Sequence, residues 1–363
     1  MKALFRTIAR LAITALPILS LSGPALAQDE HVHHHMDAGI PDMDADGKRD
    51  PGRMDHSLTP ERLAALREKI ALYRAFTDRE AELNMALMGP NYEWYVSDTS
   101  INGDVGVLVL AHGVGQNSDR LFRDSLRPMA SSRPTAISFG MAMMMSSHIQ
   151  SSVDDLTVAG AKTIVLVPTA TTRYNSLTRQ WEYVFGMRND SSYLDVPQVN
   201  TDANVIMTSH FEDHLLMTEI LLDYVREKST DPAKETVIIV GHGPEDVEDN
   251  VLDLDMQQAH VVRLKAEGGF ADVKIINLQD DAYPPIRAAN VKKLRRWVSS
   301  AERRGNTVIV VVATAASFGV QQKIIEELRG LDYIFADKGF AEHPNYQEWI
   351  AVAVDERLAA GAQ

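Results

Sequence analysis

Short apolar runs alternate with longer segments of helical periodicity along most of the chain. Apolar runs that end at glycine, proline or polar residues are typical of strands buried on both faces of a parallel sheet. The predicted strands are Val107–Leu110, Thr135–Phe139, Thr163–Val167, Asn204–Thr208, Val237–Val240, Val273–Leu278, Thr307–Val312 and Tyr333–Ala336. The predicted helices among them are Asp119–Ala130, Ile149–Val158, His214–Arg226, Met256–Glu267, Val291–Arg304 and Asn345–Val354. This alternation predicts an α/β fold with parallel sheets and right-handed crossovers.

The second part of this pattern repeats the first. The run Gly160-Ala-Lys-Thr-Ile-Val-Leu-Val-Pro aligns with Gly305-Asn-Thr-Val-Ile-Val-Val-Val-Ala, and Phe211-Glu-Asp-His aligns with Phe340-Ala-Glu-His. His112-Gly113 aligns with His242-Gly243 in the same order. Several matches in one order predict two copies of one α/β unit, at 101–229 and 235–357, related by a pseudo-two-fold axis.

Three segments precede the repeat. Residues 1–27 have the basic start, short apolar run and Ala25-Leu-Ala27 end of a cleavable secretory signal, which predicts cleavage after Ala27 and a periplasmic or secreted protein. Residues 28–56 are rich in His and Asp and are predicted to be a flexible segment. Residues 57–100 are predicted to be a helical extension, because Thr59-Pro60 forms a capping signal before apolar residues at helical spacing.

Composition excludes several classes of function. The formal net charge of −14 argues against nucleic-acid binding, which would need a basic face. There is no cysteine, so any metal must be held by His, carboxylate or Met side chains. No second apolar segment is long enough to span a bilayer after the signal is cleaved. Neither a phosphate-binding loop nor a dinucleotide fingerprint follows a predicted strand, so no nucleotide cofactor is expected.

Histidines are the main candidates for chemistry. His112 and His242 each follow a buried strand, at the edge where open α/β sheets bind ligands, so they are candidate metal ligands and catalytic groups; the alternative is a hydrogen bond to the backbone of the turn. His214 and His343 precede helices and either bind metal or shape the helix N-terminus. The N-terminal tract is either an accessory metal-collecting site or an incidental solvated stretch; its histidines are His31, His33, His34 and His35.

The first unit also carries an insertion, 175–204, next to Arg173 and Tyr174. Arginines mixed with aromatic residues suit a planar acid, such as a carboxylated macrocycle, so Arg173 and Tyr174 are candidate substrate-binding residues. The alternative is a lid or interface loop with its own small core. Met143 lies in a methionine cluster after a strand, and methionine lines pockets for flat apolar ligands.

The ordered set of motifs resembles the class II chelatases, specifically the sirohydrochlorin cobaltochelatase type, over residues 105–355. The motifs are the strand ending in His112-Gly113, the run that begins at Gly160, and the histidines His214 and His343 near the end of each unit. The resemblance implies two flavodoxin-like units that face one another across a cleft. It also implies that a divalent metal is inserted there into a sirohydrochlorin-like tetrapyrrole, without nucleotide.

In this resemblance, His112 corresponds to the family's strand-end metal-handling histidine, and His242 is its duplicate. Cobalt, nickel, iron or zinc would be the metal, as substrate or ligand. The family usually has a second histidine in the loop after the Val-Pro strand, but Thr169–Ser176 and Thr314–Gln321 contain none. The alternative function is therefore a non-catalytic periplasmic protein that binds metal or tetrapyrrole on the same scaffold. The oligomeric state does not follow from the sequence.

Overall fold

The computed structural model describes residues 42–50, 57–88, 91–113, 115–316 and 319–361. The predicted signal peptide and the histidines of the N-terminal tract lie outside these residues. Everything described below belongs to one unit, residues 40–363. None of the helices in the described part of the chain combines the length and the apolar character needed to cross a bilayer.

The first sheet has the strand order β1-β2-β4-β3-β5-β6. Its strands are β1 (Lys48–Arg49), β2 (Tyr92–Tyr95), β3 (Val105–Ala111), β4 (Thr135–Phe139), β5 (Thr163–Pro168) and β6 (Asn204–Met207). Strands β3 to β6 pair in parallel, whereas β2 pairs antiparallel with both β4 and β1. Residues 92–95, which the sequence pattern assigned to a helical extension, therefore form a strand of the first sheet.

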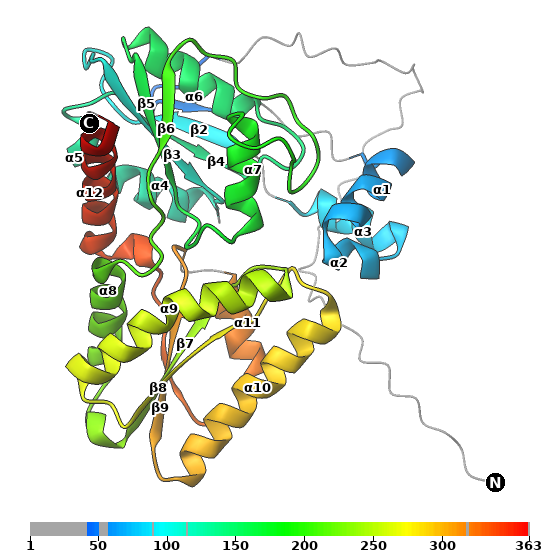
Figure 1. Cartoon of the computed structure of the whole chain (residues 1–363), viewed down its shortest axis with the longest axis vertical. Helices are drawn as coiled ribbons and strands as arrows, with labels where there is room; N and C mark the ends of the chain where they lie inside the picture. The colour runs from blue at the N-terminus through cyan, green and yellow to red at the C-terminus, as the bar shows by residue number, and fades with distance from the viewer. Residues whose placement is uncertain (1–41, 51–56, 89–90, 114, 317–318, 362–363) are drawn as a thin grey trace, which may run out of the picture. The chain divides into compact units, whose positions relative to one another are not determined.

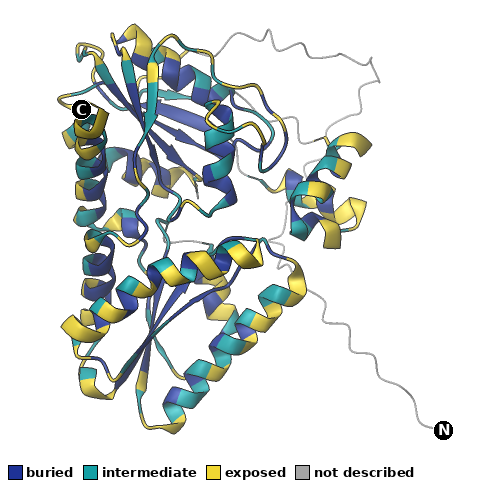
Figure 2. Cartoon of the chain, in the orientation of Figure 1, coloured by how far each residue is buried: buried dark blue, intermediate teal, exposed yellow. Residues whose placement is uncertain are grey.

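The second sheet has the order β10-β9-β7-β8 and is parallel throughout. Its strands are β7 (Glu235–Gly241), β8 (Asp272–Asn277), β9 (Thr307–Ala313) and β10 (Ile334–Ala336). This order reproduces β4-β3-β5-β6 of the first sheet, strand for strand, and the central strands of both sheets are buried (Figure 2). The predicted α/β fold with a repeated parallel unit is confirmed.

The helices between these strands follow the same repeat (Figure 1). In the first unit they are α4 (Gln116–Ser125), α5 (Arg127–Ala130), α6 (Ser147–Val158), α7 (Ser176–Val184) and α8 (Leu215–Arg226). In the second they are α9 (Val247–Gly268), α10 (Pro284–Arg303), α11 (Val320–Glu327) and α12 (Pro344–Gly361), with short 3-10 helices at Pro232–Lys234 and Phe340–Glu342. Helices α7 and α11 were not predicted from the sequence.

The last helix of each unit packs on the sheet of the other. Helix α8 contacts β9, helix α12 contacts β5, and the two helices contact each other. One apolar cluster accordingly contains Val167 of β5 and Trp349 of α12 together with Val311 of β9 and Ile220 of α8. This reciprocal exchange joins the two repeats through a shared core.

The segment before β2 forms three short helices, α1 (Pro60–Lys69), α2 (Ala71–Ala75) and α3 (Asp78–Ala86), instead of one long helix. Thr59 caps α1 by accepting a hydrogen bond from the Arg62 amide at 3.3 Å. Ile70 adopts an extended conformation that ends α1, and Thr77 with Glu80 forms a capping box that starts α3. The helical periodicity was right, but the two N-terminal caps divide it.

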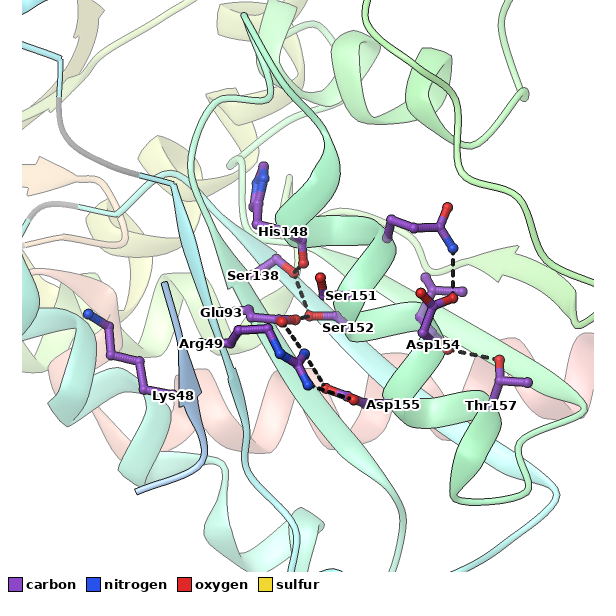
Figure 3. A network of polar contacts seen from close by, with 12 residues as sticks. Lys48, Arg49, Glu93, Ser138, His148, Ser151, Ser152, Asp154, Asp155 and Thr157 are labelled. Atoms are coloured by element: carbon purple, nitrogen blue, oxygen red, sulfur yellow. Dashed lines mark hydrogen bonds and ion pairs between the residues drawn. The ribbon is translucent and has the colours of Figure 1, made fainter. Parts of the chain in front are cut away.

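A buried polar network attaches β1 to the first sheet (Figure 3). The Arg49 guanidinium donates to Asp155 of α6 at 2.7 and 3.0 Å and also pairs with Glu93 of β2. Ser152 donates to Glu93 as well, and Ser138 bonds Ser152 at 2.8 Å. Burial raises the pKa of Glu93 to about 7, although Ser152 and Arg49 oppose the shift. One arginine thus connects β1, β2 and α6.

Candidate functional site

The two strand-end histidines occupy equivalent positions. Strand β3 ends at Ala111 and β7 at Gly241, so His112 and His242 come next, at the carboxyl edge of each sheet. The glycines that follow have positive φ, +80° at Gly113 and +76° at Gly243. A Cβ at Gly243 would lie 2.3 Å from the Cβ of Asn277. The turn at Gly243 therefore needs glycine both for its positive φ and for this close approach.

Both imidazole rings are oriented in the same way. The Nδ1 atom of His242 lies 2.9 Å from the carbonyl oxygen of Gly243, and the Nδ1 atom of His112 contacts the carbonyl oxygen of Gly113. A carbonyl oxygen can only accept, so Nδ1 carries the hydrogen and Nε2 presents its lone pair. A backbone bond at Nδ1 is also the usual way in which a protein orients a metal-binding histidine. The sequence left two roles open for these histidines, a functional role and a hydrogen bond to the backbone of the turn. The observed geometry is compatible with both roles at once.

His112 and His242 line the same cavity. It has a volume of about 810 Å³ and is lined by residues of both repeats and of the helical extension. Ligand sites commonly fall in the range of about 300–1,000 Å³, and open α/β sheets place them at the carboxyl ends of strands. This cavity is therefore the candidate site.

Carboxylates surround His242. Its Nε2 atom lies 3.5 Å from Oδ2 of Asp281, and Asp280 and Glu245 line the same part of the cavity. Asp280 is paired with Lys323 at 3.0 Å and with Arg287 at 2.9 Å. Burial raises the pKa of Asp280, but the positive charges around it outweigh burial and hold that pKa below its ordinary value.

Glu245 lies where the two repeats meet. It accepts a hydrogen bond at 2.9 Å from the hydroxyl of Ser176, the first residue of α7. Burial raises the pKa of Glu245 to about 7; the Ser176 bond opposes this shift and the negative charge of Asp281 adds to it. A carboxyl group with this pKa exchanges its proton near neutral pH, which suits a proton acceptor or donor.

The two repeats differ in the loop that supplies these acids. Ala111 of β3 pairs with Phe139 of β4, and the equivalent residue Gly241 of β7 pairs with Asn277 of β8. The loops that follow β4 and β8 therefore correspond. Counted from these paired residues, Met143 occupies the position that Asp281 has in the second repeat. Met143 also lines the cavity. Asp280, Asp281 and Glu245 were not predicted from the sequence. A signal was available, because all three lie within three residues of a predicted strand end or a His-Gly turn.

The other two candidate histidines cap helices. Nδ1 of His214 accepts from the Leu216 amide at 3.2 Å, and Nδ1 of His343 accepts from the Asn345 amide at 3.2 Å. The Nε2 atom of His343 lies 3.4 Å from Asp223. Neither histidine lines the cavity. Of the two roles open from the sequence, the structure places both histidines in the role of shaping a helix N-terminus.

Arg173 and Tyr174 do not line the cavity either. The Arg173 guanidinium donates to both carboxylate oxygens of Glu212, at 2.7 and 2.6 Å. The sequence predicted that this guanidinium would bind a planar acid, but in the structure it is already bound to Glu212. Within the insertion, Trp181 is buried in the core of the first repeat, and Arg179 pairs with Asp249 of α9 at 2.7 Å. The insertion is thus an interface element with its own core residues, the second of the two alternatives.

Among the residues that the structure describes, no three His, Asp or Glu side chains are arranged to hold a metal ion. The chemistry available in the cavity is therefore two oriented imidazoles, one from each repeat, with carboxylates beside the second. Each imidazole offers a single nitrogen, so a metal held by either one would keep most of its coordination positions open to another ligand.

Comparison with known proteins places the fold. No family model matches the chain, and no curated protein matches it. The chain is similar in structure to SirB from Bacillus subtilis with Fe3+, with a TM-score of 0.54 and 15% sequence identity over 72% of this chain and 98% of that one. It also matches DR2241 from Deinococcus radiodurans, a multi-domain protein described as similar to chelatases, with a TM-score of 0.44 and 16% identity over 69% of this chain and 54% of that one. The chain therefore shares the α/β fold of SirB.

Proposed function

We propose that this protein inserts a divalent metal ion into a tetrapyrrole held in the cavity between its two repeats. The observation that carries the proposal is that two histidines from equivalent strand ends line one cavity, each held by its Nδ1 so that Nε2 presents a lone pair. SirB from Bacillus subtilis, a protein of similar fold whose structure was determined with Fe3+, supports the proposal at the level of fold. Cobalt is the metal that the resemblance to the cobaltochelatase type implies, with nickel, iron and zinc as the other candidates.

Metal insertion makes two demands on a site. The metal must exchange bound water for ring nitrogens, and the two pyrrole N–H groups must lose their protons. An imidazole nitrogen can replace a water on the metal and then release it to the ring, since it is a single neutral ligand. His112 and His242 are the residues assigned to this step.

We assign the removal of the pyrrole protons to the carboxylates beside His242. Glu245, whose pKa is raised to about 7, can accept a pyrrole proton and return it to solvent within one turnover. Asp281, whose Oδ2 atom lies 3.5 Å from the His242 Nε2 atom, favours a bound cation at that position. Both acids belong to the second repeat, so we assign proton transfer to that side of the cavity.

We further propose that the protein works outside the cytoplasm, because residues 1–27 have the pattern of a secretory signal. The tract that contains His31, His33, His34 and His35 would then collect metal ions for the cavity.

The test is metal insertion followed by absorbance. The purified chain is mixed without oxygen with Co2+ and, in separate reactions, with sirohydrochlorin or with a porphyrin that carries two carboxylates. We expect at least one ring to be metallated faster than in the protein-free reaction. The variants His112→Ala and His242→Ala should each lower that rate by about 100-fold, the usual loss when a proton-transfer or metal-handling group is removed.

The matched controls are His214→Ala and His343→Ala, which remove imidazoles that cap helices outside the cavity. They should keep the rate of the unchanged chain. Metallation of both rings no faster than without protein would contradict the enzyme assignment. If metal or ring nevertheless binds in a manner that depends on His112 and His242, the second candidate holds, a non-catalytic binding protein. That candidate is favoured by the lack of histidine in Thr169–Ser176.

A further inference from the structure

The charged residues that line the cavity are mostly acidic. Among the described residues its wall includes five carboxylates, Asp119, Glu245, Asp280, Asp281 and Glu342. Lys323 is the one lysine or arginine among the described lining residues, and its Nζ atom is 3.0 Å from Asp280. That lysine is therefore already neutralised by the protein, and the cavity presents a net negative charge to whatever enters.

The arginines nearby are already paired with carboxylates of the protein, and Arg287 is paired with Asp280 of the wall itself. Arg173 is bound by Glu212, Arg179 by Asp249, and Arg287 by Asp280 and Glu327. None of the three lines the cavity. Releasing any of them to a ligand would leave a partly buried carboxylate without its partner, which is costly.

Much of the remaining wall is apolar, although Asn84, Ser118, Thr169 and other neutral polar residues also line it. The helical extension contributes Ile70, Leu72, Tyr73 and Met88, and the first repeat contributes Met141 and Met143. Methionine and aliphatic side chains make favourable contacts with the face of a flat conjugated ring. The extension therefore adds a wall that the repeats by themselves do not have, and its chemistry suits an apolar face.

We propose, on the basis of the metal-insertion function above, that the macrocycle this cavity takes is largely apolar and has no more than two carboxylates. An eight-carboxylate ring of the sirohydrochlorin type would bring like charges against a wall that has no free cation to receive them. The acidic side of the cavity instead receives the divalent metal ion, whose charge it attracts. The ring lies against the apolar wall, and its few carboxylates point to solvent.

The test compares binding of metal-free porphyrins that share one ring and differ in side chains. Mesoporphyrin carries two carboxylates, coproporphyrin four and uroporphyrin eight. Titration of the full chain, followed by ring fluorescence, should give a dissociation constant for mesoporphyrin at least about tenfold below that for uroporphyrin. The variant Asp281→Asn should narrow this difference, because it removes one negative charge from the wall.

Two variants test the apolar wall. Met88→Asp places a charge on the wall and should weaken mesoporphyrin binding by about tenfold. The matched control is Leu87→Asp, because Leu87 is the neighbouring residue, is 69% exposed and does not line the cavity. That control should leave binding unchanged. Circular dichroism must show that both variants retain the fold.

The outcomes separate the two proposals. Tighter binding of uroporphyrin, or binding that does not depend on the number of carboxylates, overturns the inference while metal insertion stands. Equal effects of Met88→Asp and Leu87→Asp also overturn it. Failure of every porphyrin to bind overturns the inference, whereas the proposed function falls only if sirohydrochlorin is not metallated either.

Discussion

Glu245 gives the sharpest test of the electrostatics of the site. In the folded protein its pKa is raised to about 7 from an ordinary value of 4.5 by burial and by the charge of Asp281. A carboxyl group with a raised pKa binds more protons in the folded state than in the unfolded chain between these two pH values. The free energy of unfolding therefore falls as the pH rises from about 4.5 to about 7. Above pH 7 the full destabilisation by the ionised Glu245 is present.

The size of this cost follows from the shift. Each unit of pKa is worth about 1.4 kcal/mol, so a carboxyl moved from 4.5 to about 7 costs about 3 kcal/mol at pH 8. Glu245 is partly exposed, and solvent screening reduces the expected value to about 2 kcal/mol. The variant Glu245→Gln keeps the shape of the side chain and an oxygen that can accept the Ser176 hydroxyl, but it cannot ionise.

We therefore expect Glu245→Gln to be more stable than the unchanged chain by about 2 kcal/mol at pH 8, and equal to it near pH 4.5. Urea denaturation at several pH values, followed by circular dichroism, measures the difference. The matched control is Glu248→Gln, an exposed residue in the first turn of α9, the helix that begins two residues after Glu245, which should give no such pH dependence. A Glu245→Gln variant that is less stable at pH 8 would refute the assignment of a buried, unfavourably ionised carboxyl.

Three further predictions concern the fold. Trp349→Ala should lower the free energy of unfolding by about 3–5 kcal/mol, because Trp349 is fully buried in the core that α8 and α12 share; in urea denaturation both repeats should still unfold in one transition, and two separate transitions would contradict the shared core. Arg49→Ala should destabilise by about 3 kcal/mol at pH 9 and by less at pH 6, where the buried partner Glu93 can take up a proton; thermal denaturation at the two pH values checks this, and a loss that does not change with pH would count against it. His343→Ala should lower the free energy of unfolding by about 1 kcal/mol, because a helix cap is lost, and should leave metal affinity unchanged. Calorimetric titration with Co2+ measures that affinity. Weaker binding by the variant would show that His343 is a metal ligand.

The candidate site was only partly predictable. The positions of His112 and His242 followed from apolar runs that end in His-Gly, because a strand end is a local feature of the sequence. The pairing of Arg173 with Glu212 could not be predicted in this way, since it joins residues 39 positions apart, with α7 and β6 between them. The same holds for Asp281, whose approach to His242 depends on the register between β7 and β8.

The sequence by itself determined the order of the parallel strands and of most helices between them, the repeat, and which residues end the two central strands. Those properties depend on periodicity within a few residues and on similarity between two segments of one chain. Only the tertiary structure decided that α8 and α12 exchange sheets, that the helical extension forms one wall of the cavity, and that the acids of the second repeat gather beside His242. The physical reason is that each of these requires surfaces far apart in the chain to fit one another, and a local hydrophobic pattern specifies that a face is buried without specifying its partner.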